Sequence, residues 1–365
     1  MTSFALGLVV NPVAGMGGRV GLHGTDSSTL ARARERGALP VSPARAARAI
    51  ARLRDLAPRL TVLAAGGPMG ADHLQGTGWD VAVLPVRPGE TDAGDTREAV
   101  AEMVAAGVHL VLFVGGDGTA RAVAEAAGAV PILGVPAGVK MHSGVFGTTP
   151  DAAGVAAGRY LADPDRFATR AAEVVDRDKS GVVRLFGTVR VPAVPAAVQQ
   201  RKGASADGGH DVAVLGREVA AEMEPGRLYL LGPGTTVAHV SAALGLPSTP
   251  LGVDAVLDGR LVARDAGEDE LLALLAETSR ACLVLGVVGG QGFLLGRGNQ
   301  QLSPAVLRAV GTDNIEVLAA PAKVGALEEP VLHIDIDDAD LAAHLLGYRR
   351  VRTGRARSTV LRVVA

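Results

Sequence analysis

The chain has 365 residues, of which 48% are hydrophobic and 20% charged, so it can bury a large core and is long enough for two domains. Its formal net charge is −2, with both signs interspersed, which gives no argument for a nucleic-acid or membrane-surface partner. The single cysteine, Cys282, excludes a disulfide framework within the chain and a metal site built from cysteines.

The amino-terminal segment MTSFALGLVVNP lacks a basic region and is too short for a secretory signal peptide. The apolar runs along the chain have the length of strands rather than of membrane spans. We therefore expect a soluble cytoplasmic protein that has no membrane partner.

Strands and helices alternate along the first part of the chain. Strands are expected at residues 4–10, 61–65, 80–84, 109–114 and 131–135. Helices are expected from Ser42-Pro43, from an Asp95-Thr96 cap to Gly107, and from the turn at 115–119 to Gly128. This alternation indicates a mostly parallel sheet covered by helices, and such sheets bind ligands beyond the carboxyl ends of their strands.

The pattern changes after about residue 165, where proline-punctuated strand composition appears. Strands are expected at 182–192, 227–232, 281–288 and 314–320, a hairpin with an Asp258-Gly259 turn at 256–263, and helices at 236–244, 268–279 and 303–310. The expected fold class is α/β, with a Rossmann-like parallel sheet in residues 1–150 and a second, mixed α/β domain in residues 151–310. The segment 311–365 is expected to return to the first domain or to seal the cleft.

Residues 111–119, VLFVGGDGT, are the most informative stretch. A strand-like run ends at Val114, and Gly115, Gly116 and Gly118 then flank Asp117 before Thr119 opens an Ala-rich helix. Glycines let backbone amides approach an anion, and a helix amino terminus favours negative charge. Asp117 can hold a metal ion or accept a proton there, so the arrangement suits phosphoryl transfer. The alternative is a tight turn capped by Asp117, but the three glycines exceed what a cap needs.

A glycine-rich loop, NPVAGMGGRVG, follows the first strand of the same expected sheet. Its candidate phosphate-binding residues are Asn11, Pro12, Gly15, Gly17 and Gly18. The loop lacks the third glycine of the dinucleotide fingerprint, and no Gly-Lys pair of a P-loop occurs in the chain. By itself it is equally well read as a flexible loop, but beside the 115–119 turn it becomes the second wall of a phosphate site.

Further candidate binding residues lie in three other segments. Lys140, His142 and Ser143 in the loop after the 131–135 strand would contact phosphate or ribose, or else form a solvated loop. Gly234, Thr235 and Thr236 in the turn GPGTT would hold a phosphate or ribose, or else simply open a helix. The segment 289–301 is glycine-dense and serves packing or binding equally well. Asp176, Asp178 and Asp254 are candidate second acids.

Together these motifs resemble the ATP-NAD kinase family, and more closely its AcoX-like branch, within a superfamily that includes diacylglycerol kinases. The GGDGT turn is specific for the superfamily, and NPVAGMGGRVG, PAGVKMHSGVF, GPGTT and GGQGFLLGRGNQQ are similar to the branch across almost the whole chain. GPGTT looks like a variant of the family's T-G-S-T turn. The chain shows no clear equivalent of the family's Asn-Glu or Asn-Asp pair, for which Asp176 or Asp178 would have to substitute.

The resemblance implies a kinase that uses ATP or polyphosphate with Mg²⁺ to phosphorylate the 2′-hydroxyl of the adenosine ribose of NAD, giving NADP. It implies Asp117 as the base, the glycines and the Asn11–Gly18 loop around phosphates, Lys140 as a neutralising charge, and Thr235 and Thr236 at the acceptor nucleotide. Related kinases often form homo-oligomers, so the resemblance allows one here. Two alternatives are a kinase acting on a lipid, a sugar or another nucleotide, and a non-catalytic nucleotide sensor.

Overall fold

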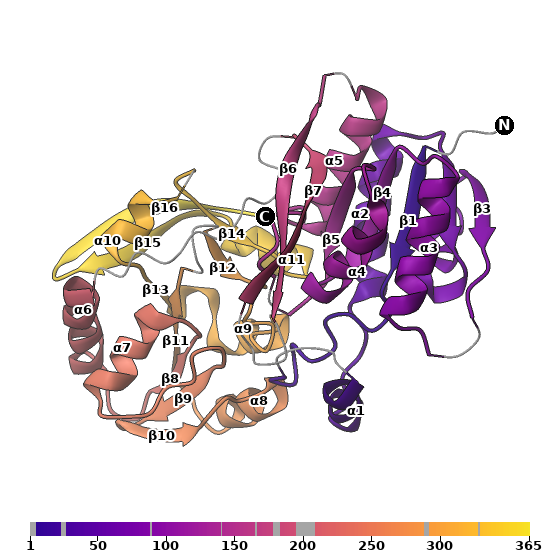
Figure 1. Cartoon of the computed structure of the whole chain (residues 1–365). Helices are drawn as coiled ribbons and strands as arrows, with labels where there is room; N and C mark the ends of the chain where they lie inside the picture. Colours follow the sequence, from indigo (N-terminus) through magenta and orange to yellow (C-terminus); the bar gives the residue numbers. More distant parts are fainter. Residues whose placement is uncertain are drawn as a thin grey trace. The chain divides into compact units, whose positions relative to one another are not determined.

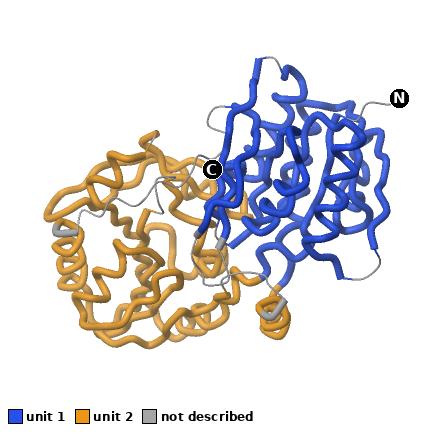
Figure 2. Tube along the Cα trace, viewed as in Figure 1, with its two compact units in different colours: residues 1–16, 39–202 blue, residues 17–38, 203–365 orange. Residues whose placement is uncertain are grey.

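The computed structural model describes residues 5–22, 27–87, 90–139, 141–164, 166–177, 183–194, 209–287, 292–327 and 329–365. The chain forms two compact units, which Figure 2 shows in different colours. Residues 1–16 and 39–202 make up the first unit, and residues 17–38 and 203–365 make up the second.

A five-stranded parallel sheet forms the centre of the first unit, in the order β3-β2-β1-β4-β5 (Figure 1). The strands are Leu6–Val10 (β1), Thr61–Ala65 (β2), Asp80–Leu84 (β3), Leu110–Gly115 (β4) and Ile132–Pro136 (β5). Strands β1, β4 and β5 are buried along their whole length, as their continuous apolar sequences require in a parallel sheet covered by helices. The expected amino-terminal parallel sheet is confirmed.

Four helices pack on this sheet as two pairs, α2 with α5 and α3 with α4. They are Ser42–Leu56 (α2), Ala93–Ala105 (α3), Asp117–Ala127 (α4) and Pro150–Ala162 (α5), and two short 3-10 turns cover Gly67–Met69 (η1) and Ala71–Leu74 (η2). Glycines in α5 permit its close approach to α2, since a Cβ atom at Gly158 would lie 2.8 Å from Cβ of Leu56.

The start of α3 differs from the expected cap at Asp95-Thr96. The N-cap is Asp92, whose carboxylate accepts hydrogen bonds from the amides of Gly94 and Asp95. The side chain of Asp95 in turn accepts from the amide of Asp92 at 2.8 Å, which completes a capping box. Asp95 is therefore the third helical residue of the box rather than the cap itself.

An antiparallel pair of strands, Thr169–Arg177 (β6) and Val183–Pro192 (β7), completes the first unit. The pair packs against α4 and β5. The first unit consequently extends to residue 202, beyond the boundary expected at residue 150.

The second unit contains a nine-stranded mixed sheet in the order β10-β9-β8-β11-β13-β15-β16-β14-β12. Its strands are Leu228–Leu231 (β8), Asp254–Leu257 (β9), Arg260–Ala263 (β10), Ala281–Gly286 (β11), Phe293–Leu295 (β12), Ile315–Leu318 (β13), Val331–Ile334 (β14), Gly347–Gly354 (β15) and Arg357–Val364 (β16). Its helices are Ser27–Glu35 (α1), Gly209–Ala221 (α6), Thr235–Ala243 (α7), Glu268–Ala276 (α8), Pro304–Val310 (α9), Pro321–Gly325 (α10) and Ala339–Leu345 (α11), with a 3-10 turn at Thr312–Asn314 (η4). The expected mixed domain is confirmed.

The hairpin of β9 and β10 and the carboxyl-terminal strands can be compared with the elements expected from the sequence. Strands β9 and β10 form the expected hairpin, with left-handed backbone at Asp258 (φ 52°) and Gly259 (φ 70°), as a tight Asp-Gly turn requires. Strands β13, β15 and β16 all pair within the second sheet. The segment 311–365 therefore completes the second unit, whereas we expected it to return to the first domain or to seal the cleft.

The segment 17–38 also packs with the second unit, although it interrupts the first in the sequence. The carbonyl oxygen of Arg19 accepts a hydrogen bond from the amide of Glu268 at 2.9 Å. The side chains of the same two residues form an ion pair at 3.9 Å. In the part of the chain that the structure describes, no helix has the length and apolar character needed to cross a membrane.

Candidate functional site

Asp117 is the first residue of α4 and follows the turn at the carboxyl end of β4. Its side chain is only 7% exposed, and two consecutive amides bind its carboxylate. The amide of His142 donates to one carboxylate oxygen at 2.7 Å, and the amide of Ser143 donates to the other at 3.0 Å. The carboxylate is therefore held in one orientation at the amino end of a helix.

The surroundings of Asp117 raise its proton affinity. Burial raises the pKa of its carboxyl to about 6, because the charged form loses contact with water. Hydrogen bonds from Ser143 and from the His142 amide oppose this rise in pKa, and the negative charge of Asp176 adds to it. A carboxylate whose pKa lies near neutrality is suited to accept a proton from a hydroxyl group.

The glycines of the 115–119 turn are required by close backbone contacts. A Cβ atom at Gly115 would overlap the side chain of Thr119, and one at Gly138 would lie 2.7 Å from Cα of Gly116. The carbonyl of Gly115 accepts hydrogen bonds from the amides of Ala137 and Gly138 at 2.9 and 3.2 Å. The turn after β4 and the turn after β5 therefore form one packed backbone structure around the amino end of α4.

Asn11 joins the loop after β1 to this turn. Its side-chain amide donates to the hydroxyl of Thr119 at 3.0 Å, and its side-chain oxygen accepts from the amide of Val13 at 3.1 Å. Pro12 is half-buried in the turn that follows β1. The sequence predicts Asn11 and Thr119 in two walls of one site, and the structure brings their side chains into contact.

The three candidate glycines of the same loop have different surroundings. Gly15 has left-handed backbone (φ 78°) in the first unit, and a Cβ atom there would overlap Val41 and the carbonyl of Ala137. Gly17 and Gly18 belong to the second unit, where a Cβ atom at Gly18 would lie 3.0 Å from Cβ of Gln300. The carbonyls of Gly17 and Gly18 accept hydrogen bonds within the same loop, from the amides of Leu22 and Gly21.

The loop after β5 contributes its backbone to the site. The hydroxyl of Ser143 is buried and bound to strand β6, donating to the carbonyl of Val175 at 2.8 Å and accepting from its amide at 3.1 Å. The hydroxyl is thus engaged within the protein, while the amides of His142 and Ser143 bind Asp117. Lys140 lies outside the described residues.

A second acid lies near the amino end of α4. Asp176, on β6, faces Gly118, where an added Cβ atom would lie 3.9 Å from its carboxylate oxygen. Asp178 lies outside the described residues. Asp254 is buried in the second unit, and its carboxylate accepts hydrogen bonds from the amides of Thr249 and Asp265, so it fixes local loops.

The GPGTT turn connects β8 to α7 in the second unit. Gly234 is the N-cap of α7, and its left-handed backbone (φ 112°) requires glycine. Thr235 is exposed and Thr236 is buried at the first two positions of the helix. The turn thus places the exposed hydroxyl of Thr235 and the amino end of a nine-residue helix at the carboxyl end of β8.

The segment 293–301 holds its own conformation through side-chain bonds. Asn299 donates to the carbonyl of Leu294 and accepts from the amide of Gly296. Arg297 is buried above the Phe293 ring, at 4.6 Å from its centroid, and forms an ion pair with Asp335 at 3.6 Å. These contacts are those of a packing loop.

Two contacts that position Asp117 were not foreseen from the sequence. They are the bond of Ser143 to Val175, 32 positions away, and the packing of Gly138 on Gly116. Neither has a local pattern that could have indicated it. Only PAG at 136–138 marked a tight turn, as proline and glycine do.

Comparison with family models gives two matches that follow one another along the chain. Residues 6–164 match the ATP-NAD kinase N-terminal domain, and residues 225–363 match the ATP-NAD kinase C-terminal domain. The searches of curated proteins and of solved structures returned no match. The two models together cover most of the chain and agree with the GGDGT turn and its buried acid, so this chain belongs to the ATP-NAD kinase family.

Proposed function

We propose that this protein transfers a phosphoryl group from ATP or polyphosphate to the 2′-hydroxyl of the adenosine ribose of NAD, giving NADP. The observation that carries the proposal is Asp117, a buried carboxylate fixed by two amides at a helix amino end, with a pKa of about 6. Membership of the ATP-NAD kinase family supports the choice of phosphoryl transfer and of nucleotide substrates.

The turn that holds Asp117 suits a phosphate chain. Gly116 and Gly118 present backbone without side chains at the amino end of α4, where the helix dipole favours an anion. The side chain of Asn11 and the hydroxyl of Thr119 stand beside this turn, bonded to each other. Mg²⁺ would come with the donor phosphates and neutralise their charge, an arrangement that keeps several waters and needs few protein carboxylates.

Phosphoryl transfer requires mainly that the two substrates be positioned and their charge neutralised. Asp117 would orient the acceptor hydroxyl and take its proton as the new P–O bond forms and the bond to the donor's leaving phosphate breaks. Because the Asp117 carboxylate is fixed by the 142 and 143 amides, it needs no reorganisation to accept that proton. We assign the exposed Thr235 and the GPGTT turn to binding of the acceptor nucleotide.

The test is Asp117→Asn with labelled γ-phosphate and a panel of NAD, NADH, ADP-ribose and diacylglycerol. Turnover with NAD should fall by at least ~100-fold, the low end of a general base's contribution. Asp151→Asn is the control, because Asp151, on α5, is ion-paired to Arg48 and Arg52 of α2 and does not contact Asp117.

Stability must be measured in parallel with turnover. Both oxygens of Asp117 accept amide hydrogens, so the NH₂ group of an asparagine would face one amide donor and weaken the fold locally. Near-normal turnover in a folded Asp117→Asn protein would remove Asp117 from the role of base. Transfer to another member of the panel but not to NAD would overturn the acceptor assignment.

A further inference from the structure

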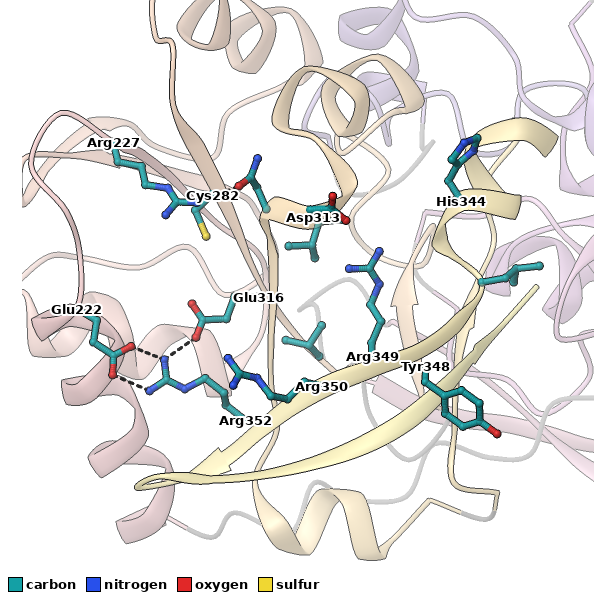
Figure 3. A pocket seen from close by; sticks show the side chains of 14 residues that line it. Glu222, Arg227, Cys282, Asp313, Glu316, His344, Tyr348, Arg349, Arg350 and Arg352 are labelled. Atoms are coloured by element: carbon teal, nitrogen blue, oxygen red, sulfur yellow. Dashed lines mark hydrogen bonds and ion pairs between the residues drawn. The ribbon is translucent and has the colours of Figure 1, made fainter.

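The second unit contains a polar cavity of about 570 Å³ that the proposed activity does not use (Figure 3). It lies at the amino ends of parallel strands, since Cys282 is the second residue of β11 and Ile315 the first of β13. The GPGTT turn instead follows the carboxyl end of β8, which runs parallel to β11. The cavity is therefore at the opposite edge of the sheet from the turn assigned to the acceptor.

Four arginines line this cavity against three carboxylates, which are those of Glu222, Asp313 and Glu316. Two of the arginines are neutralised within the protein. Arg352 donates to Glu222 at 2.7 Å and to Glu316 at 2.6 Å, as the dashed lines in Figure 3 show. Arg227 is bound to Glu224 at 2.9 Å and to Asn314 at 3.1 Å.

The other two arginines, Arg349 and Arg350, have no carboxylate within ion-pair distance among the described residues. Arg349 is half-buried and donates to the carbonyl of Thr312 at 2.9 Å. Partial burial lowers the pKa of its guanidinium, because the charged form has lost water, and the charge of Asp313 opposes this only partly. Arg350 is exposed beside it. An anion from outside would compensate both cations.

We propose that this cavity binds a small phosphorylated molecule that also carries hydroxyl groups, with Arg350 holding the phosphate and Arg349, on the other face of β15, adding positive charge to the cavity. The guanidinium fork matches phosphate oxygens bidentately, which favours phosphate as the anionic group. The carboxylates of Asp313 and Glu316 line the same space and are hydrogen-bond acceptors, so they suit hydroxyl groups and disfavour a long polyanion. The volume lies within the range of small-molecule sites.

The sole cysteine of the chain provides a local reporter, because Cys282 lines the cavity. Burial raises the pKa of its thiol to about 11, so it reacts slowly with thiol reagents at neutral pH. A ligand in the cavity should slow the reaction further. The reaction of Cys282 with methyl methanethiosulfonate at alkaline pH therefore reports occupancy independently of kinase activity.

The experiment compares glucose 6-phosphate, glucose and inorganic phosphate by calorimetry and by protection of Cys282, with saturating NAD and ATP present. Saturation with these nucleotides separates this cavity from the proposed nucleotide site. Glucose 6-phosphate should bind and protect Cys282, phosphate should bind more weakly, and glucose should do neither. Among the described residues, the Arg350 side chain makes no hydrogen bond or ion pair, so Arg350→Ala should fold and bind glucose 6-phosphate at least ~10-fold more weakly.

Arg362→Ala is the matched control. Arg362 is an exposed arginine on β16, opposite Tyr348 in the sheet register, and it does not line the cavity. The affinity of the Arg362→Ala protein for glucose 6-phosphate should equal that of the wild type. Absence of glucose 6-phosphate binding, equal weakening in both variants, or equal binding of glucose alone would each overturn the proposal.

Discussion

Removal of the Ser143 hydroxyl tests how strand β6 controls the base. Ser143→Ala takes away the group that donates to the carbonyl of Val175 and accepts from its amide, both of them buried. Each buried main-chain group left without a partner costs about 1–3 kcal/mol, so the loss of two partners should remove ~2–6 kcal/mol of unfolding free energy in the first unit. The Ser143 side chain also lowers the pKa of Asp117, so its removal should raise that pKa above about 6, while the amide of residue 143 remains bonded to the carboxylate.

The assay is kcat/KM for phosphoryl transfer as a function of pH. A base must be ionised to act, so wild-type activity should rise with pH along an acid limb centred at about 6, and Ser143→Ala should move that limb to higher pH. Thr149→Ala is the control, because Thr149 is a buried hydroxyl that caps α5 through the Ala152 amide and does not contact Asp117. It should cost about 1 kcal/mol and leave the limb unmoved. An acid limb that stays in place in a folded Ser143→Ala protein would refute the reasoning.

Three further outcomes follow from the same geometry. Burial raises the pKa of Asp117 from 3.8 to about 6 in the folded state. Its contribution to the free energy of unfolding is therefore complete below pH 4, and about 3 kcal/mol of it should be lost as the pH rises through about 6. Denaturant titrations of wild type and Asp117→Asn across this pH range would measure the loss. Gly115→Ala should unfold or distort the turn and abolish nucleotide binding by calorimetry, whereas Gly187→Ala, where a Cβ atom meets nothing within 4 Å, should leave it intact. Asn11→Ala loses the hydrogen bonds to Thr119 and to the amide of Val13. It should raise KM for the phosphoryl donor and have a smaller effect on Tm. An unchanged KM would exclude Asn11 from the site.

Local pattern predicted much of the fold because the strands of both sheets are short apolar runs bounded by turn residues. The hairpin at Asp258-Gly259 was predicted in this way, and so was the helix after the 115–119 turn, although it begins at Asp117 rather than at Thr119. The start of α3 was misplaced because two acids three positions apart, Asp92 and Asp95, both resemble a cap, and only their reciprocal hydrogen bonds distinguish them.

What the sequence could not predict depends on contacts between distant residues. Nothing near Ser143 indicates that its hydroxyl binds Val175, or that the paired amides at 142–143 would fix Asp117. The segment 17–38 looked like part of the first domain because it lies within it in the sequence, yet its packing partners include Glu268 and Gln300. The cavity beside Arg349 likewise gathers residues from 222 to 352.

The backbone passes from one unit to the other three times, after residues 16, 38 and 202. A single cut therefore cannot release either half as a complete body. A fragment ending at residue 202 would retain 17–38 without the rest of the second unit, and so without the contacts of Arg19 with Glu268 and of Gly18 with Gln300. The chain is therefore not two independent domains joined end to end. To produce the two units separately, residues 17–38 would have to be moved from the first fragment to the second.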